Sequence, residues 1–186
     1  MIQVRHLEIF PTSLFRWESV LDMQEFDYIS KLEFEDKEYV SYEPLEEKIH
    51  ECVRDAMGIH RIHADEYEIE ITEMWGNVSP KGKDHHPHSH PNNYYSGIFY
   101  LTTGEPTVFL DPRPANTTLV PKHTPSHFVD TICTCDAIPN SIVLFNSWLH
   151  HYVPVNKSDQ TRKTLSFNVI LRGDYGPDNS LARVKI

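Results

Sequence analysis

The spacing of apolar residues changes along the chain, from the period of a helix to that of strands. In residues 43–59 (EPLEEKIHECVRDAMGI) apolar side chains recur every three to four positions, which predicts one amphipathic helix with Gly58 placed to cap its end. In residues 65–76 apolar side chains alternate with glutamates, the pattern of a half-buried strand. We therefore expect the chain to pass from a helical segment into β structure.

Short strands are predicted over most of the remaining chain. Each candidate segment is rich in β-branched and aromatic residues and is bounded by Gly, Pro, Asn or Asp. The segments are residues 96–103, 105–112, 140–148, 151–155 and 162–173. Residues 113–136 follow no such pattern, and a loop of this length inside a compact domain is usually functional. We expect an N-terminal helical layer followed by an antiparallel sandwich or barrel.

Composition narrows the class of protein. A chain of 186 residues with 39% hydrophobic residues is long enough for one domain with a buried core. No apolar run approaches the roughly 20 residues that span a bilayer, and the N-terminus shows no signal-peptide pattern. The chain has three cysteines, an odd number, which argues against a disulfide framework. Together with the missing signal-peptide pattern, this predicts a cytoplasmic protein. The net charge of −10 and the lack of a Lys/Arg cluster disfavour nucleic acid as a partner.

Candidate chemistry begins with the histidines. Four of the 12 lie in residues 85–90 (HHPHSH), in a cluster that is internal and interrupted, unlike an expression tag. On an extended strand His88 and His90 point the same way, as two neighbouring metal ligands would. A second pair, His150 and His151, joins two predicted strands much later in the chain. Because antiparallel strands can bring two such places together, the histidines predict a metal site at the mouth of a barrel.

The strand predicted at residues 162–173 has one polar face. A period of two places four polar side chains on that face: Arg162, Thr164, Ser166 and Asn168. An arginine that points inward presents a planar pair of donors suited to one carboxylate. The strand therefore predicts a polar interior with a carboxylate-binding arginine.

Four segments in this order resemble a known family. They are MWGNVSPKGKDHHPHSHPNNYYSGIFYL, FLDPR, IVLFNSWLHHYVPVN and RKTLSFNVI, between about Glu68 and Arg172. They are similar to iron(II)- and 2-oxoglutarate-dependent oxygenases of the prolyl-hydroxylase-like group, and the N-terminal IFPTSLFRW is more loosely similar. The resemblance implies a mainly β, double-stranded β-helix (jelly-roll) domain. Its implied parts are a single domain over 1–186, with a helical support region over 1–66, a core over 67–172 and a loop or lid over 113–136.

The resemblance also assigns roles to residues. His88 matches the first iron ligand, and His151 matches the distal one through its HxV context. Arg162 matches the residue that binds the distal carboxylate of 2-oxoglutarate, and Tyr100 matches a tyrosine that often hydrogen-bonds that carboxylate. Ser166 lies on the matching strand face. The implied cofactors are Fe(II) and 2-oxoglutarate, and the implied reaction couples decarboxylation to succinate with C–H hydroxylation.

The third ligand position departs from the wider superfamily, which has Asp or Glu two residues after the first histidine. Here that position is His90, in an HxHPN version that the resemblance assigns to a subgroup. The predicted ligands are therefore His88, His90 and His151. His86 is the alternative to His90; otherwise His85 and His86 are expected to be polar loop residues.

Other interpretations fit parts of the sequence. Gly82 and HSH match the start of a cupin motif, although the glutamate of that motif is missing. A binding module that has lost catalysis would also explain a histidine at the third ligand position. A separate zinc site could be formed by four residues of the long loop, His123, His127, Cys133 and Cys135.

The substrate is predicted only by class. A protein or peptide residue is the first expectation and a small molecule the second, and no membrane partner is expected. Residues 113–136 are the expected source of selectivity, because loops at the mouth of a barrel control access. A homodimer is compatible with the sequence.

Overall fold

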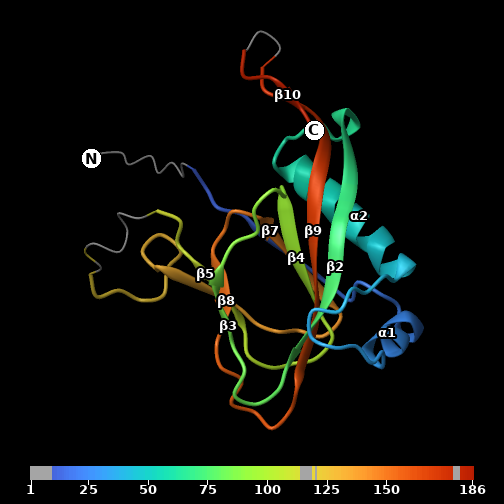
Figure 1. Ribbon diagram of the computed structural model, residues 1–186. Coiled ribbons are helices and arrows are strands. Elements are labelled where there is room, and N and C mark those ends of the chain that lie inside the picture. Colours follow the sequence, from blue (N-terminus) through green and yellow to red (C-terminus); the bar gives the residue numbers. More distant parts are fainter. Residues whose placement is uncertain (1–9, 114–118, 120, 178–180) are drawn as a thin grey trace.

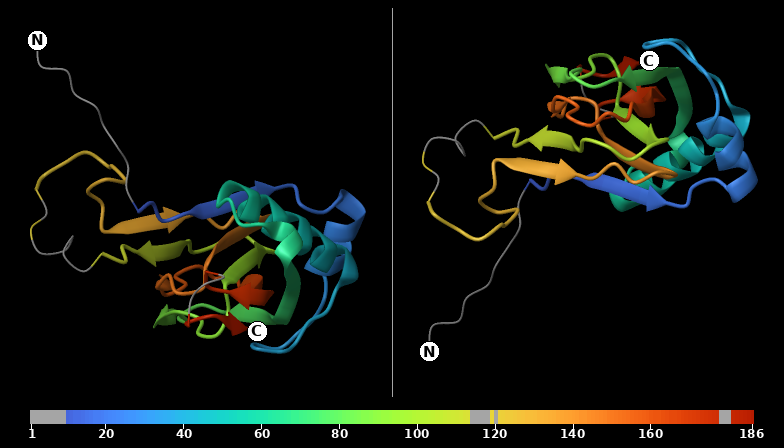
Figure 2. Two further views of the ribbon diagram at one scale, coloured as in Figure 1. Left: turned by 90° about the horizontal axis from the view of Figure 1, so that it is seen from above. Right: turned by 90° about the horizontal axis from the view of Figure 1, so that it is seen from below.

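The computed structural model describes residues 10–113, 119, 121–177 and 181–186. Two helices lie on one side of a large antiparallel sheet, and a smaller sheet lies on the other side (Figure 1, Figure 2). The helices are α1 (Met23–Ser30) and α2 (Glu43–Ile59), and a 3₁₀ turn follows at Ala64–Glu66. No helix in the described part of the chain is both long and apolar enough to cross a membrane.

The strands form two antiparallel sheets. The large sheet has the order β1-β7-β4-β9, with β2 and β10 both paired to β9, and the small sheet has the order β3-β8-β5-β6. The bounds are β1 Leu14–Glu18, β2 Tyr67–Ser79, β3 His85–His88, β4 Tyr95–Tyr100, β5 Thr107–Leu110, β6 Ile132–Cys135, β7 Ser141–Asn146, β8 His151–Val153, β9 Arg162–Tyr175 and β10 Val184–Lys185. This arrangement confirms the predicted mainly β jelly-roll with a helical layer.

Strand β4 shows how the layers share one core. Its residues alternate: Phe99 packs with α2 residues such as Leu45 and Ile49, whereas Ile98 and Tyr100 pack between the two sheets. Both faces of the strand are therefore covered, which explains why SGIFYL is nearly all apolar rather than alternating with polar residues. The central strands of the large sheet therefore lie between the helices and the small sheet.

One of the two helices, α2, was predicted from the sequence, with a difference at its C-terminal end. The predicted helix at residues 43–59 is α2, but Gly58 is an interior helical residue and the helix is capped at His60. The turn out of the helix uses Arg61, whose φ is 57°, so the cap prediction for Gly58 was wrong. Helix α1 was not predicted. Its capping box, in which Asp22 and Glu25 bond each other's backbone N–H, is the sequence signal that marks it.

Four strands lie outside the predicted strand segments: β1, β3, β6 and β10. Strand β1 lies in the N-terminal segment and pairs with β7, so part of residues 1–66 belongs to the large sheet. Strand β6 lies within residues 113–136 and pairs with β5. Three of its four residues are exposed, so the alternation that identifies a strand is absent. Strand β3 ends at His88, so His90 lies just beyond regular strand geometry.

Gly97 tests how tightly β4 is packed. A Cβ at this position would lie 2.1 Å from the ring of Phe167, which is fully buried on the neighbouring strand. Gly97→Ala is expected to lower the free energy of unfolding by about 1–3 kcal/mol. The matched control is Gly58→Ala in α2, where no atom lies within 4 Å of the added Cβ and the variant should be as stable as the parent or slightly more stable. Urea unfolding of both variants measures the difference; equal midpoints would contradict the packing argument.

Candidate metal and cosubstrate site

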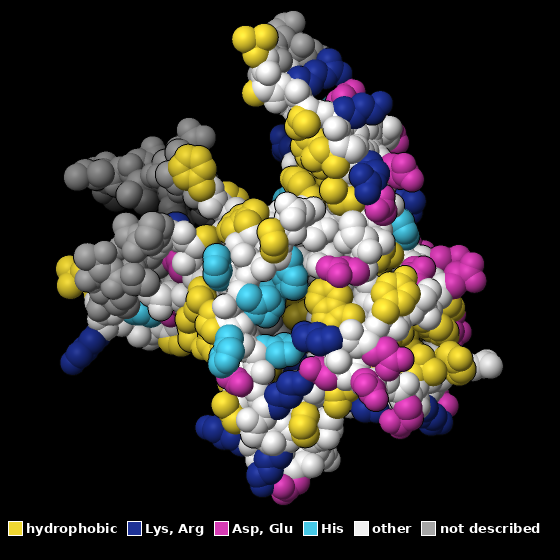
Figure 3. All heavy atoms as spheres, in the orientation of Figure 1, with side chains coloured by type: hydrophobic (Ala, Val, Ile, Leu, Met, Phe, Trp, Pro, Cys, Tyr) yellow, Lys and Arg dark blue, Asp and Glu magenta, His cyan; other side chains and the backbone are white. Residues whose placement is uncertain are grey.

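Three histidines meet between the two sheets. His88 ends β3, His90 follows two residues later, and His151 begins β8, directly opposite His88 in the β3–β8 pairing. One ring nitrogen from each lies within 4.8 Å of the others. The ring centroids are 4.4 Å apart for His88 and His151, 5.1 Å for His88 and His90, and 5.3 Å for His90 and His151. Figure 3 shows histidine side chains gathered around a recess on this face.

Two of these rings are oriented by backbone carbonyls. Nδ1 of His88 lies 2.7 Å from the His86 carbonyl oxygen, and Nδ1 of His151 lies 2.9 Å from that of Leu149. A carbonyl oxygen only accepts, so each Nδ1 carries the proton and donates it. In both rings Nε2 then keeps its lone pair for a metal, which is the usual arrangement of a ligating histidine.

Burial favours the neutral form of three histidines here, His85, His90 and His151. His151 is only 4% exposed, and desolvation lowers its pKa to about 3, although its hydrogen bond to Leu149 acts in the opposite direction. Desolvation likewise lowers the pKa of His90 and of His85 to about 4. Neutral imidazoles are the form that binds a divalent metal ion.

Acid is expected to destabilise the metal-free protein. The folded pKa values of His151, His90 and His85 lie below the ordinary value of 6.5. Below about pH 6.5 the unfolded chain therefore takes up protons that the folded chain does not, and the free energy of unfolding falls as pH falls. Urea midpoints measured without metal at about pH 7 and about pH 5 should show this loss. Equal midpoints would contradict it, because ordinary carboxyl groups titrate below that window.

Arg162 lies in the same cavity as the histidines. It begins β9, is 2% exposed, and lines this cavity together with Thr164 and Ser166, as the predicted polar strand face required. Its Nε donates to the Glu105 carbonyl oxygen at 3.0 Å, and its guanidinium carbon lies 5.5 Å from the centre of the Tyr100 ring. Burial lowers its pKa. Within the described residues Arg162 makes no ion pair with a carboxylate, so its charge is available to a ligand.

Three buried polar atoms lack a hydrogen-bond partner in the described part of the chain, and all three belong to residues that line this cavity. They are Nε1 of Trp75, Nε2 of His85 and Nη2 of Arg162. The first and the last can only donate. Because leaving a buried donor unpaired costs free energy, their convergence on one cavity indicates a ligand rich in acceptor oxygens.

The polar residues between these atoms add further donors. The Asn77 side chain, 2% exposed, donates from Nδ2 to Ser166 Oγ at 2.8 Å and to Thr164 Oγ1 at 3.4 Å. Each hydroxyl therefore accepts from Asn77 and keeps its own proton to donate elsewhere. 2-Oxoglutarate at neutral pH offers acceptor oxygens and no donors, so the residues present fit it.

His85 was expected to be a polar loop residue, and this was wrong. It lies in β3, pairs with Val153 and lines the cavity, because the β3–β8 pairing turns it inward. His86 was also expected to be a polar loop residue; it lies in β3 as well, but its side chain is 90% exposed and lies 3.4 Å from the Asp84 carboxylate. The inward position of His85 depends on strand pairing, so no local signal in the sequence reveals it.

Tyr100 lies behind the arginine rather than among the residues that line the cavity. Its hydroxyl is 2.8 Å from Thr107 Oγ1, a hydrogen bond in which either oxygen can be the donor. Its ring faces the Arg162 guanidinium, and the side chain is fully buried. A role in orienting Arg162 follows directly from this packing, whereas the expected hydrogen bond to 2-oxoglutarate stays a prediction.

The residues of the alternative zinc site are not brought together. Among the described residues, the histidine group at 88, 90 and 151 is the one cluster with metal-binding geometry. Cys135 Sγ accepts from Arg16 at 2.8 Å, Cys133 is exposed on β6, and His123 lies 3.6 Å from the Asp130 carboxylate. Cys133 and Cys135 lie on β6, which pairs with β5.

Several solved structures are similar in fold to this chain. A prolyl-4-hydroxylase from Pseudomonas putida is 13% identical, with 89% of this chain and 88% of that chain covered and a TM-score of 0.60. HygX from Streptomyces hygroscopicus, solved with nickel, 2-oxoglutarate and hygromycin B bound, is 14% identical, with 90% and 84% covered and a TM-score of 0.59. The collagen prolyl hydroxylase of Paramecium Bursaria Chlorella virus-1 is 14% identical, with 88% and 98% covered and a TM-score of 0.54.

The family follows from the sequence match. The family model described as "Putative 2OG-Fe(II) oxygenase" matches residues 73–168, just over half of the chain. The protein therefore belongs to this family of 2-oxoglutarate-dependent, non-haem iron oxygenases, as the resemblance indicated. A search of curated proteins found no match.

Proposed function

We propose that this protein is a hydroxylase in which His88, His90 and His151 hold iron(II) and Arg162 binds the distal carboxylate of 2-oxoglutarate. The observation that carries the proposal is the meeting of three imidazoles and a buried guanidinium, whose Nη2 has no partner among the described residues, in one cavity. Ser166 and Thr164 donate hydrogen bonds along the cosubstrate between these two ends. Tyr100 fixes the plane of the arginine.

The side chains of this site have roles distinct from those of iron(II) and 2-oxoglutarate. When bound, iron(II) and 2-oxoglutarate supply the oxidising chemistry, in which O₂ and 2-oxoglutarate give succinate, CO₂ and a hydroxylated C–H bond. The protein positions the cosubstrate through Arg162 and excludes water with the apolar walls formed by Phe145 and Ile98. Three neutral imidazoles leave the charge of a divalent ion uncompensated, which favours an anionic oxygen ligand beside them.

The substrate in this proposal is a protein or peptide residue. Two of the structures similar in fold are named prolyl hydroxylases, and one of these acts on collagen by its name. The net charge of −10 supports the choice against nucleic acid, because a polyanion would be repelled. The exposed segment that contains β6, together with its neighbouring loop, is a surface on which such a chain can lie.

The test is turnover with peptide substrates. Iron-loaded protein, 2-oxoglutarate and a library of proline-, lysine- and asparagine-containing peptides should form succinate in step with a mass gain of one oxygen atom. The matched control is the same assay with His151→Ala. Succinate formation by neither protein would favour a binding module without catalysis, and oxidation of small molecules but no peptide would replace the proposed substrate class.

A further inference from the structure

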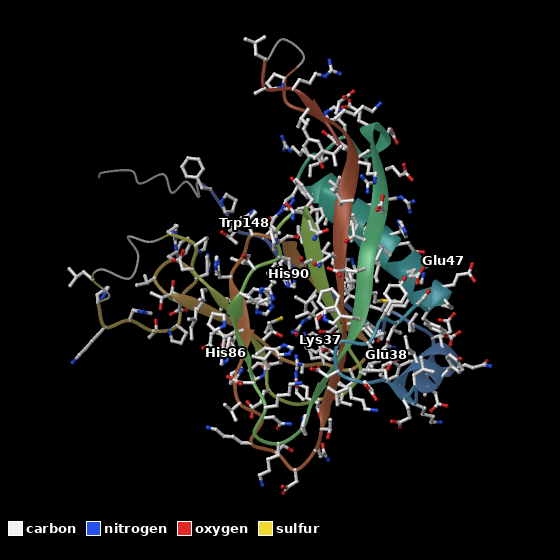
Figure 4. The ribbon with its side chains drawn as sticks, in the orientation of Figure 1. Lys37, Glu38, Glu47, His86, His90 and Trp148 are labelled. Carbon is white, nitrogen blue, oxygen red and sulfur yellow. The ribbon has the colours of Figure 1, made fainter. Side chains whose placement is uncertain are left out.

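A second cation lines the same cavity at its mouth. Lys37 is exposed, whereas Arg162 is 2% exposed, so the two charges lie at different depths of one cavity. In Figure 4 Lys37 approaches the space between the sheets that also contains His90. The adjacent carboxylate of Asp36 is engaged by Lys83. Across the described residues Lys37 makes no ion pair; its Nζ donates to the neutral Asn77 Oδ1 at 2.7 Å.

The backbone directs Lys37 toward the cavity. Its φ is 69°, a left-handed conformation that a lysine adopts only when its surroundings hold it there. Its N–H donates to the Gly76 carbonyl oxygen at 2.8 Å, and the Gly76 N–H donates to the Glu38 carbonyl oxygen at 2.8 Å. A Cβ on Gly76 would lie 2.1 Å from the ring of Phe34, so glycine at this position lets the loop lie against β2. The placement of Lys37 is therefore part of the fold.

Trp75 adds an unpaired donor beside Lys37. The lysine Nζ lies 5.8 Å from the centre of the indole ring, and that ring lies 5.9 Å from the ring of His90. The indole Nε1–H is buried without a hydrogen-bond partner. Both groups can only donate, so a ligand at this place must supply acceptor oxygens and, opposite an ammonium, negative charge.

We propose that Lys37 and Trp75 form a carboxylate-binding point at the mouth of the cavity, separate from Arg162. The cavity has a free volume of only about 30 Å³, so a ligand needs side chains to move before it can enter. In this proposal Lys37 gives up its hydrogen bond to the Asn77 amide and binds the carboxylate of the ligand instead. This inference rests on the proposed binding of 2-oxoglutarate by Arg162. The carboxylate has two sources, the group next to the keto carbon of 2-oxoglutarate or an acidic group of the substrate.

The first arm of the test uses 2-oxo acids. Isothermal titration of the Mn(II)-loaded protein compares 2-oxoglutarate with 2-oxovalerate, which lacks the distal carboxylate. If the cosubstrate is the source, Lys37→Met raises the dissociation constants of both acids by about tenfold, the loss of one hydrogen bond to a charged group. Trp75→Phe, which removes the N–H together with the five-membered ring of the indole, should act in the same direction. Lys81→Met is the matched control, because Lys81 carries the same charge in a surface ion pair with Asp159.

The second arm uses pairs of acids and amides as substrate probes. The α-methylamides of N-acetylglutamate and N-acetylglutamine, of which only the first has a carboxylate, are titrated into the protein already holding Mn(II) and 2-oxoglutarate, with ligand-observed NMR as the readout. If the substrate is the source, the parent protein binds the acid more tightly than the amide. Lys37→Met should abolish this preference while leaving the dissociation constant of 2-oxoglutarate unchanged.

Different results of these titrations would refute the carboxylate-binding point and the proposed role of Arg162. If Lys37→Met changes neither the binding of 2-oxo acids nor the acid preference, and its melting temperature equals that of the parent, the carboxylate-binding point is refuted. A parent protein that binds the acid no more tightly than the amide and shows no Lys37 effect on 2-oxoglutarate refutes it equally. Failure of the parent protein to bind 2-oxoglutarate refutes instead the proposed role of Arg162.

Discussion

Replacing His151 with alanine is expected to lower the affinity for a divalent metal by more than about a hundredfold. Even the loss of a residue that only hydrogen-bonds a metal ligand lowers metal affinity by about ten- to a hundredfold, and His151 is a proposed ligand itself. His151 is buried, its proton is fixed on Nδ1 by the Leu149 carbonyl oxygen, and its Nε2 faces the other two rings. Removing it leaves two of three ligands. The measurement is a competitive titration of Mn(II) or Co(II) against a chelator.

The chain provides a matched control for this experiment. His150 is the neighbouring histidine and is exposed, so His150→Ala should keep the metal affinity of the parent. The same titration decides between His90 and His86 as third ligand. We expect His90→Ala to weaken binding strongly and His86→Ala to have no effect, since the His86 side chain is 90% exposed. The reverse result, or full affinity in His151→Ala, would show that the ion is held elsewhere.

Replacing Arg162 with lysine is expected to raise the dissociation constant of 2-oxoglutarate by about ten- to a hundredfold, equivalent to one lost charge-assisted hydrogen bond of about 1.5–3 kcal/mol. The ammonium keeps the charge but cannot reproduce the planar pair of donors. Nη2 has no hydrogen-bond partner among the described residues, whereas Nε already donates to the Glu105 carbonyl oxygen. We therefore expect the loss of Nη2 to account for most of the weaker binding. Isothermal titration of the Mn(II)-loaded variant measures the change.

Two controls make the Arg162 result specific. Arg172→Lys changes an exposed arginine that pairs with Glu70, and it should leave 2-oxoglutarate binding unaltered. The affinity of Arg162→Lys for Mn(II) should equal that of the parent, because Arg162 is not a ligand. With 2-oxovalerate, which lacks the distal carboxylate, Arg162→Lys and the parent should bind alike. A loss that is just as large for 2-oxovalerate would mean that the substitution acts by distorting the cavity.

Local periodicity explains which parts of the fold the sequence predicted. Helix α2 has an apolar stripe of its own, and strand β9 carries a polar face that alternates with an apolar one. The spacing of apolar residues is visible in the sequence because one face of each element packs against the core and the other does not. Strand β1 is half-buried along most of its length and β6 is mostly exposed, so neither carries an alternating pattern. Their existence depends on partners, β7 and β5, that are distant along the chain.

The amino-acid sequence alone specifies the kinds of group in the candidate site: closely spaced histidines before one strand, a histidine pair before another, and an arginine on a polar strand face. Which of these side chains share the cavity depends on how the strands pair. The β3–β8 pairing sets His88 opposite His151 and turns His85 inward, and the bridge between Tyr39 and Trp75 carries Lys37 to the mouth. The physical reason is that side-chain direction on a strand is set by pairing register, and register is a relation between distant segments that no local pattern contains.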